Sequence, residues 1–434
     1  MQYVQQILFA LALGVAIYFF TNKVKQIRRN IFLGKDKKID DNKSERWKTM
    51  ARVALGQSKM VVRPIAGILH IIVYVGFVLI NIEVLEILID GLFGTHRVLS
   101  FLGPVYDAAI GFFEILALLV LVACVFFLTR RFISKIPRFH KPEMKGWATK
   151  DATYILIMEI VLMAALLKMN AADQLLQERG ADHFITAGSF PVSQYLTGFF
   201  ESYSTSTLIV FERVFWWFHI IGILLFLNYV PYSKHLHIFL AFPNTWYSKL
   251  NSVGELPNMP EITNEVNMML DPSKADPNMP PPEKFGVADV TDLSWKNLLD
   301  AYTCTECGRC TSVCPANLTG KKLSPRKVMM DTRDRAEELG KAKDANGDDH
   351  HDGKSLHDYI SQEELLACTT CNACVEACPV NIDPVDIIFG MRQYQTLEKS
   401  AMPSEWAMMN SNIENNQAPW QFSPTDRANW TKEI

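Results

Sequence analysis

Eight of the nine cysteines form two copies of one pattern, C-x2-C-x2-C-x3-C-P. Thiolates at this spacing bind two [4Fe-4S] clusters, because the fourth cysteine of each run binds the cluster that the other run holds with its first three. The pattern therefore predicts two clusters. We expect the first to be bound by Cys304, Cys307, Cys310 and Cys378, and the second by Cys368, Cys371, Cys374 and Cys314.

The spacing and context of these cysteines argue against two other uses. A structural zinc site takes four ligands and does not use a triple run that ends in Cys-Pro. Disulfide frameworks belong to small secreted domains, whereas this chain has 434 residues of mixed composition. The ninth cysteine, Cys124, stands alone in an apolar run, and we expect it to be a small buried hydrophobic residue.

The first half of the chain is much more apolar than the second. It contains five apolar runs that are each long enough to cross a bilayer, which takes about 20 residues. We therefore predict an all-α membrane domain, a five-helix bundle, over residues 1–240. The runs are residues 4–21, 61–89, 104–129, 152–169 and 206–231.

The second half is polar, and its cysteine runs predict a cytoplasmic dicluster domain over residues 291–400. We expect this domain to be mainly helical (α+β) and ferredoxin-like. Residues 241–290 are rich in Pro and Asn and read as a semi-extended linker. Residues 401–434 are expected to be an extended tail that docks a partner. A net charge of -3 and a pI near 6.4 argue against nucleic acid as a partner.

The distribution of positive charge predicts how the chain crosses the membrane. Segments 22–60 and 130–150 are crowded with Lys and Arg, whereas segments 90–103 and 170–205 carry one Arg each. Loops rich in Lys and Arg stay on the cytoplasmic side. We therefore expect a multi-pass protein of the bacterial inner membrane, with its N-terminus in the periplasm and its cluster domain in the cytoplasm.

Histidines in two of the apolar runs are placed to bind haem. His70 lies in the second run and His219 in the fifth. A bis-histidine haem needs two facing imidazoles from different helices, so we predict that this pair binds one haem b. His237 follows His219 by 18 residues, on the same helix face and roughly 27 Å away if the helix continues past Pro231. It is therefore the candidate ligand of a second haem.

The sequence leaves open which residue would be the other ligand of a second haem. Met60, ten residues before His70, has a thioether that can bind haem iron, or it is a packing residue. Each membrane histidine can instead be a structural hydrogen-bonding residue. Gly67 would let a macrocycle or a neighbouring helix approach closely. The loop histidines, which we expect to be solvated, are His96, His140 and His183.

The histidines on the second and fifth helices resemble those of the cytochrome b (gamma) subunit of respiratory nitrate reductase. In that family the position ten residues before the second-helix ligand is also histidine, whereas here it is Met60. The cysteine runs and residues 323–327 resemble the dicluster segment of heterodisulfide-reductase-type iron–sulfur oxidoreductases. Residues 412–430 look like the segment that precedes the cysteine-rich catalytic domain in fused members of that family. The resemblance implies haem b, two clusters and a cysteine-rich iron–sulfur partner in the cytoplasm.

Together these features predict an electron-transfer subunit of a quinol-linked oxidoreductase complex. Electrons would pass in either direction between menaquinone or ubiquinone, haem b, the two clusters and the heterodisulfide-reductase-like partner. One alternative is a membrane anchor and docking subunit with clusters only and no quinone site. Another is a complete oxidoreductase, which is disfavoured because the clusters use all eight cysteines of the runs. Candidate proton acceptors are Glu83, Glu86, Asp107, Glu114, Glu159 and Lys168.

We predict that the purified chain contains about eight iron atoms and about eight acid-labile sulfides, as two four-iron clusters require. Iron and sulfide analysis of anaerobically purified protein measures both. Stoichiometric zinc with little sulfide would contradict the cluster assignment.

Overall fold

The structure, a computed structural model, describes residues 3–280 and 283–432. Residues 281 and 282 of the predicted linker lie outside the described ranges. The chain is 69% helical, and the described residues form no β-strand. The predicted β component of the cluster domain is therefore wrong within these ranges. One isolated bridge joins Lys35 to Ser294, and the cysteine loops are closed by short helices instead of hairpins.

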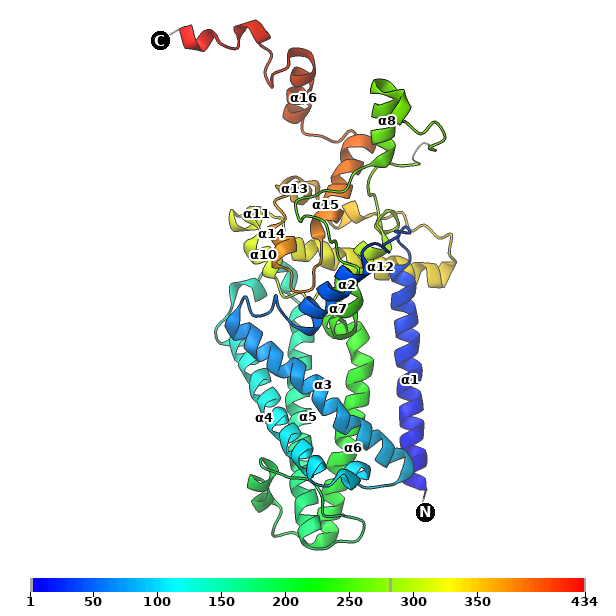
Figure 1. Cartoon of the computed structure of the whole chain (residues 1–434), viewed down its shortest axis with the longest axis vertical. Coiled ribbons are helices and arrows are strands. Elements are labelled where there is room, and N and C mark those ends of the chain that lie inside the picture. The colour runs from blue at the N-terminus through cyan, green and yellow to red at the C-terminus, as the bar shows by residue number, and fades with distance from the viewer. Residues whose placement is uncertain (1–2, 281–282, 433–434) are drawn as a thin grey trace.

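Five long apolar helices form the membrane domain (Figure 1). At a rise of about 1.5 Å per residue, each is long enough to cross a hydrocarbon layer of about 30 Å. This confirms the five predicted spans and makes the chain a multi-pass membrane protein. The helices are α1 (Val4–Ile31), α3 (Pro64–Phe93), α4 (Pro104–Phe132), α5 (Trp147–Glu178) and α6 (Thr205–Tyr229).

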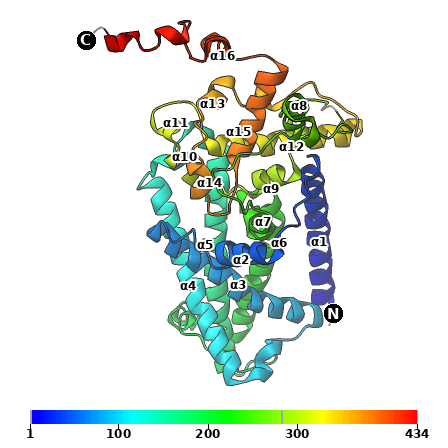
Figure 2. The same cartoon turned by 45° about the horizontal axis from the view of Figure 1, so that its top comes forward.

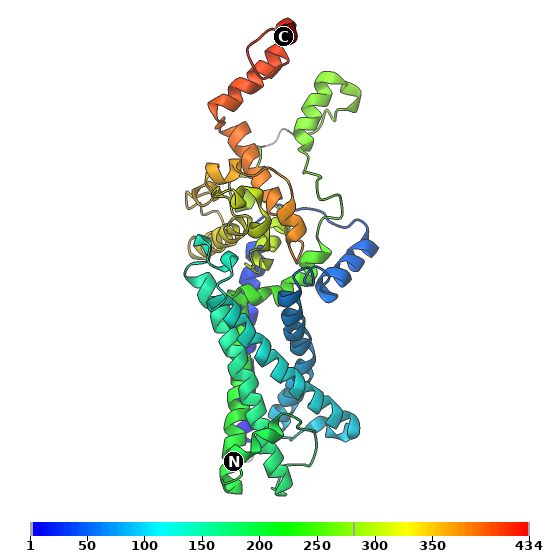
Figure 3. The same ribbon diagram turned by 90° about the vertical axis from the view of Figure 1, so that its left-hand side faces the viewer.

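The helices α3 to α6 pack in chain order, whereas α1 stands at the edge and contacts α3 and α6 (Figures 1 and 3). The contact between α1 and α3 depends on one glycine. A Cβ on Gly91 would lie 2.8 Å from the ring of Phe9, so only glycine lets that ring reach the α3 backbone. The Phe9 ring also contacts Trp216 and Trp217 of α6. Phe9 therefore ties α1 to the bundle at the end where the N-terminus lies.

The fifth membrane helix does not continue through Pro231. The α-helix ends at Tyr229, and two short 3-10 turns lead into α7 (His237–Trp246). Proline lacks an N–H and cannot continue the hydrogen-bond ladder. The predicted separation of about 27 Å along one continuous helix is therefore wrong. α7 and α2 (Lys43–Met50) pack together across the end of the bundle below the cluster domain (Figure 2).

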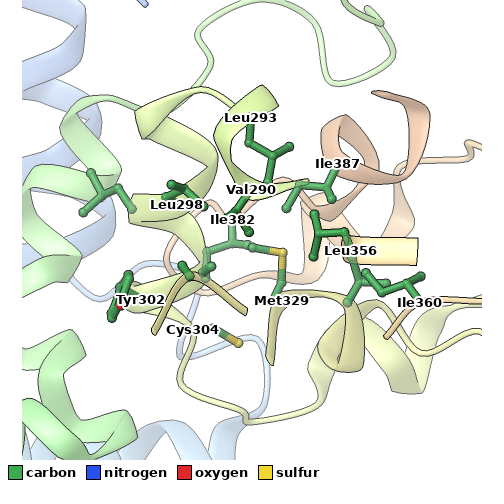
Figure 4. Packing of buried hydrophobic residues seen from close by; sticks show 14 of the residues in the cluster. Val290, Leu293, Leu298, Tyr302, Cys304, Met329, Leu356, Ile360, Ile382 and Ile387 are labelled. Carbon is green, nitrogen blue, oxygen red and sulfur yellow. The ribbon is translucent and has the colours of Figure 1, made fainter. Parts of the chain in front are cut away.

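The cluster domain consists of one long helix, α12, and several short helices around one hydrophobic core. Figure 4 shows part of this core, in which Leu298, Met329 and Ile387 converge beside Cys304. Three ligand candidates, Cys304, Cys314 and Cys378, belong to the same buried cluster. The helices are α9 (Trp295–Thr303), α10 (Arg309–Val313), α11 (Pro315–Leu318), α12 (Pro325–Asn346), α13 (Gln362–Leu366), α14 (Ala373–Ala377) and α15 (Pro384–Gln393).

The predicted linker and tail are partly helical, not extended throughout. The linker contains the end of α7 and α8 (Pro260–Leu270), and the tail contains α16 (Ser404–Asn416). Both α8 and α16 project away from the body on the side opposite the membrane domain (Figures 1 and 3). No residue of α16 is buried, so its conformation does not depend on the rest of the described chain.

Candidate functional site

The two cysteine runs come together around two adjacent cavities. The helices α10 and α14, one from each run, pack against each other. The first cavity is lined by Cys304, Cys307, Cys310, Cys374 and Cys378, and the second by Cys314, Cys368, Cys371 and Cys374. Each cavity therefore has the fourth cysteine of the opposite run in its lining, which is the exchange that the spacing predicts.

The loops coil around these cavities because several residues adopt left-handed backbone conformations. Glu306, Gly308, Thr370 and Asn372 all have positive φ angles between 52° and 68°. Such turns point successive N–H groups inward. In the second run, the N–H of Thr370 donates to Cys368 Sγ at 3.4 Å. Donors of this kind stabilise thiolates and tune the reduction potential of a cluster.

The chemistry of the cavities fits an iron–sulfur cluster. The eight cysteines are free thiols, and burial raises the pKa of Cys304 and of Cys378 to about 12. Without a cation these thiols stay protonated, whereas bound iron would keep them as thiolates. No three Cys, His, Asp or Glu side chains among the described residues converge on one point, as a single ion would require. A [4Fe-4S] cluster instead takes one thiolate on each of four irons and supplies one-electron transfer.

Two buried guanidinium nitrogens beside the first cavity have no hydrogen-bond partner within the described ranges. They are Nε of Arg138 and Nε of Arg326. Burial and the neighbouring Arg63 lower the pKa of Arg138 to about 10, so positive charge is crowded here. An anionic cluster in the first cavity would relieve this crowding.

Arg326 lies in the segment 323–327, and nothing in the sequence of that segment indicates its role. It is fully buried, and its Nη2 donates to Glu143 at 2.7 Å, in the loop between α4 and α5. Its Nη1 occupies the space where a Cβ on Gly308 would lie, at 2.4 Å from that position. Gly308 therefore has to be glycine, both for this contact and for its positive φ. Arg326 holds the first cysteine loop against the membrane domain.

A buried ion cluster joins the same loop to the segment that carries His237. Lys234 Nζ donates to Glu306 at 2.5 Å and to the Ala148 carbonyl at 2.6 Å. Burial alone would raise the pKa of Glu306, but Lys234 and Arg333 lower it below its usual range. Glu306 lies between Cys304 and Cys307, and Lys234 lies three residues before His237. The first cluster loop and this histidine segment are thus joined by one ion pair.

The structure pairs the membrane histidines differently from the sequence prediction. The rings of His70 and His237 have centroids 6.4 Å apart. His219 is deeper in α6, where its Nδ1 is bound to the Leu162 carbonyl at 3.1 Å. The break at Pro231 turns His237 back toward α3, which a straight helix would not do. The structure therefore brings His237 beside His70.

Met60 and Gly67 are also placed differently from expectation. The sulfur of Met60 lies 3.5 Å from Nη2 of Arg309, on the side of the first cysteine loop. A Cβ on Gly67 would lie 2.7 Å from the Met60 carbonyl oxygen, so Gly67 accommodates its own preceding loop. Packing against this loop therefore explains the glycine at position 67 without a neighbouring haem.

The prediction that His96 is solvated is wrong, whereas His140 and His183 are exposed. The side chain of His96 is 8% exposed, and its Nε2 lies 3.1 Å from Asp173 of α5. The loop after α3 folds back over the bundle because Asp90 accepts hydrogen bonds from the N–H groups of Arg97 and Val98. Nothing local in the sequence indicates that fold-back.

Residues 303–382 match the family model for the 4Fe-4S dicluster domain. The chain is 30% identical over 457 residues to "Probable iron-sulfur-binding oxidoreductase FadF" of Bacillus subtilis, covering 98% of this chain and 61% of the relative. It is 27% identical over 412 residues to "EtfAB:quinone oxidoreductase" of Syntrophomonas wolfei, covering 88% and 53%. Over 167 residues it is 36% identical to "Probable membrane-anchored ferredoxin" of Chromohalobacter salexigens, covering 35% and 24%.

Shorter stretches match the C subunits of heterodisulfide reductases. No solved structure matches the chain. The chain spans 53–61% of the length of the first two relatives. These matches confirm the predicted dicluster domain and its likeness to iron–sulfur oxidoreductases. The chain therefore combines a multi-pass membrane domain with a 4Fe-4S dicluster domain of the kind found in electron-transfer oxidoreductases.

We predict that two variants that each remove a ligand of the same cluster leave the same spectrum, that of the other cluster. This should hold even when the two substituted cysteines belong to different runs. Cys378→Ala and Cys307→Ala should each lose about four irons and leave one identical cluster signal, because both residues line the first cavity. Cys314→Ala and Cys371→Ala should leave the other signal. Electron paramagnetic resonance of the reduced proteins measures this.

Cys124→Ala is the control and should keep both signals, because Cys124 is buried in α4. The assignment is wrong if Cys378→Ala instead matches Cys371→Ala, a change within its own run.

Proposed function

We propose that this chain carries electrons between a membrane quinone pool and a cytoplasmic iron–sulfur partner, through haem b and two [4Fe-4S] clusters. The buried Lys234–Glu306 pair carries this proposal. It joins the segment that bears His237 to the loop that bears Cys304 and Cys307, and so supports a haem and the first cluster held close together. Rigid spacing of this kind is what sequential one-electron transfer requires.

The two cluster cavities differ in exposure, which supports an order of transfer. Cys304 and Cys378 of the first centre are buried, and Arg309 beside them donates to the carbonyls of Lys59 and Met60 just before α3. In the second centre Cys371 is exposed. Electrons leaving the membrane domain would therefore pass through the first cluster to the second, where a partner can approach.

The His70–His237 pair fits a bis-histidine haem. Two imidazoles that bind one metal ion at roughly 2.0–2.1 Å have ring centroids about 6 Å apart. The observed separation is 6.4 Å. His237 Nδ1 is bound to the Lys234 carbonyl at 2.9 Å, which leaves Nε2 for iron and fixes the ring orientation. His219 is oriented in the same way, which supports it as a ligand of a second haem.

The arrangement also supports an orientation with the N-terminus in the periplasm. The two Lys- and Arg-rich segments lie at the end of the bundle that contacts the cluster domain, as shown by Arg309 with Lys59 and by Arg326 with Glu143. By the positive-inside rule this end faces the cytoplasm. The cluster domain would then lie in the cytoplasm of a bacterial cell.

The C-terminal tail is our candidate docking segment for the partner. The tail follows α15, where Arg392 donates to the carbonyl of Cys368 in the second cluster loop. A partner bound to the tail would therefore be held near the second centre. Large exposed apolar side chains mark interaction sites, with Trp prominent among binding hot spots. Those of the tail are Trp406, Met408, Met409, Ile413, Trp420, Phe422 and Trp430.

We predict that menadiol, a soluble quinol, reduces the clusters of the full chain reconstituted in lipid vesicles, and that His70→Ala and His237→Ala both block this reduction. Both variants should lose the absorption of the haem that this pair would bind, because each lacks one axial ligand, while dithionite still reduces their clusters. His140→Ala, an exposed loop change, is the control. Optical and paramagnetic spectra measure both cofactors.

If menadiol fails to reduce wild-type clusters, the chain is instead a docking subunit without a quinone site. If His219→Ala loses all haem and His237→Ala keeps it, the pairing predicted from the sequence is right and ours is wrong.

We predict that deletion of residues 405–434 leaves haem and clusters intact but releases the iron–sulfur partner from the purified complex. No residue of α16 is buried, so the deletion should not destabilise the cluster domain. Co-purification with a tagged chain measures the partner. Truncated protein that retains every partner of the full chain would contradict the docking role.

A further inference from the structure

We infer that the cavity at the end of the bundle farthest from the cluster domain binds the head group of a quinone, with His96 and Glu83 as its proton-exchanging residues. This inference rests on the proposed function and names the site where the quinone would react. The cavity has a volume of about 640 Å³ and lies between α1, α3, α5, α6 and the loop after α3. Pockets for ligands of this size have about 300–1,000 Å³.

His96 is oriented for proton exchange in this cavity. Its side chain is only 8% exposed, its Nε2 is bound to Asp173 Oδ1 at 3.1 Å, and its Nδ1 is buried with no partner among the described residues. Asp173 is itself held by Arg97, at 2.6 Å from Nη2. A carboxylate on one imidazole nitrogen fixes the ring and leaves the other nitrogen to a ligand. His96 is one of the residues that line the cavity, so Nδ1 is the ring nitrogen left to a ligand there.

Glu83 supplies a second group inside the membrane domain. It lines the cavity, is 5% exposed, and makes no hydrogen bond within the described ranges. It lies ten residues before the end of α3, roughly 15 Å along the helix. Ionisable residues at such depth are costly and usually functional. The other cavity carboxylates of α3 and α6 differ, since Glu86 accepts from Tyr106, Asp90 accepts from the N–H of Arg97, and Glu212 pairs with Arg213.

The cavity also has apolar walls for a quinone ring. Met169, Trp216 and Trp217 line it from α5 and α6. The two indole rings are positioned by Phe9 of α1, at centroid distances of 5.6 and 6.1 Å. A flat ring with two oxygens matches this combination of aromatic walls and two unpartnered polar groups better than an inorganic ion, which needs no apolar wall.

The cavity is close to the proposed electron route. Trp216 in its wall lies three residues before His219, roughly 4.5 Å along α6. His219 in turn lies between the cavity and the end of α6 that leads to His237. A quinone in the cavity would therefore be next to the deepest histidine of the membrane domain.

The reaction balances with the groups present. Oxidation of a quinol breaks two O–H bonds and yields quinone, two protons and two electrons. One proton goes to Nδ1 of His96 and the other to the carboxylate of Glu83, before release to solvent at this end of the bundle. The two electrons leave one at a time, and the cysteines of the two cavities would hold two clusters that can each take one. Quinone reduction is the same sequence reversed.

The test uses the full chain in lipid nanodiscs, with the quinol analogue HQNO (2-heptyl-4-hydroxyquinoline N-oxide) as probe. Fluorescence quenching gives its affinity, and menadiol-driven cluster reduction gives turnover. His96→Phe keeps the ring volume but removes the nitrogen, so it should weaken HQNO binding roughly tenfold or more. Glu83→Gln should slow menadiol oxidation. Glu178→Gln is the matched control, an exposed carboxylate at the end of α5 that does not line the cavity, and should change neither.

Intact haem and cluster spectra in every variant establish that each protein is folded. If wild-type protein oxidises menadiol and His96→Phe binds HQNO as tightly as wild type does, the site inference is wrong and the proposed function stands. If wild-type protein neither binds HQNO nor oxidises menadiol, the proposed function itself fails. If Glu178→Gln impairs both readouts as strongly as the cavity variants, binding is not located in this cavity.

Discussion

The buried ammonium of Lys234 is the interaction on which the union of the two domains depends. It bonds Glu306 of the first cysteine loop and a carbonyl of α5, and Arg333 shares the same carboxylate. Removing one partner of a buried ion pair costs about 3–5 kcal/mol, because the remaining charge is left without compensation. Such a penalty resists sliding of the cluster domain on the bundle. Under the proposed function, this would fix the separation between the haem and the first cluster.

Further contacts make this junction broad. Asn30 at the end of α1 donates to Tyr302 at 2.9 Å, Arg326 binds Glu143, and Asn244 donates to the Val380 carbonyl at 2.9 Å. The contacts on the membrane side come from loops or helix ends at one end of the bundle. Most involve a charged or amide side chain that is largely buried, so they are directional as well as strong. One end of the bundle thus holds the cluster domain in place.

The opposite end of the bundle has a different polar network, and its composition agrees with a site for proton chemistry. Arg97, His96 and Asp173 connect the loop after α3 to α5, and Glu114 accepts hydrogen bonds from Asn170 and from the backbone of Ser193. Most of these groups satisfy one another. Among the described residues, Nδ1 of His96 and Oε1 of Gln6 are buried without a partner, and both residues line the cavity together with Glu83.

The sequence by itself determined the features that depend on local pattern. The cysteine spacing predicted which thiols share a cavity, because three of each set lie within seven residues and a short loop can wrap only one centre. Hydrophobic length predicted the five spans, because the bilayer fixes how many apolar residues a helix needs. Tertiary structure alone decided that His237 lies beside His70, through the turn after Pro231. It also buried His96 through Asp173, 77 residues away. Contacts at such separation depend on how helices pack, and no local pattern encodes that packing.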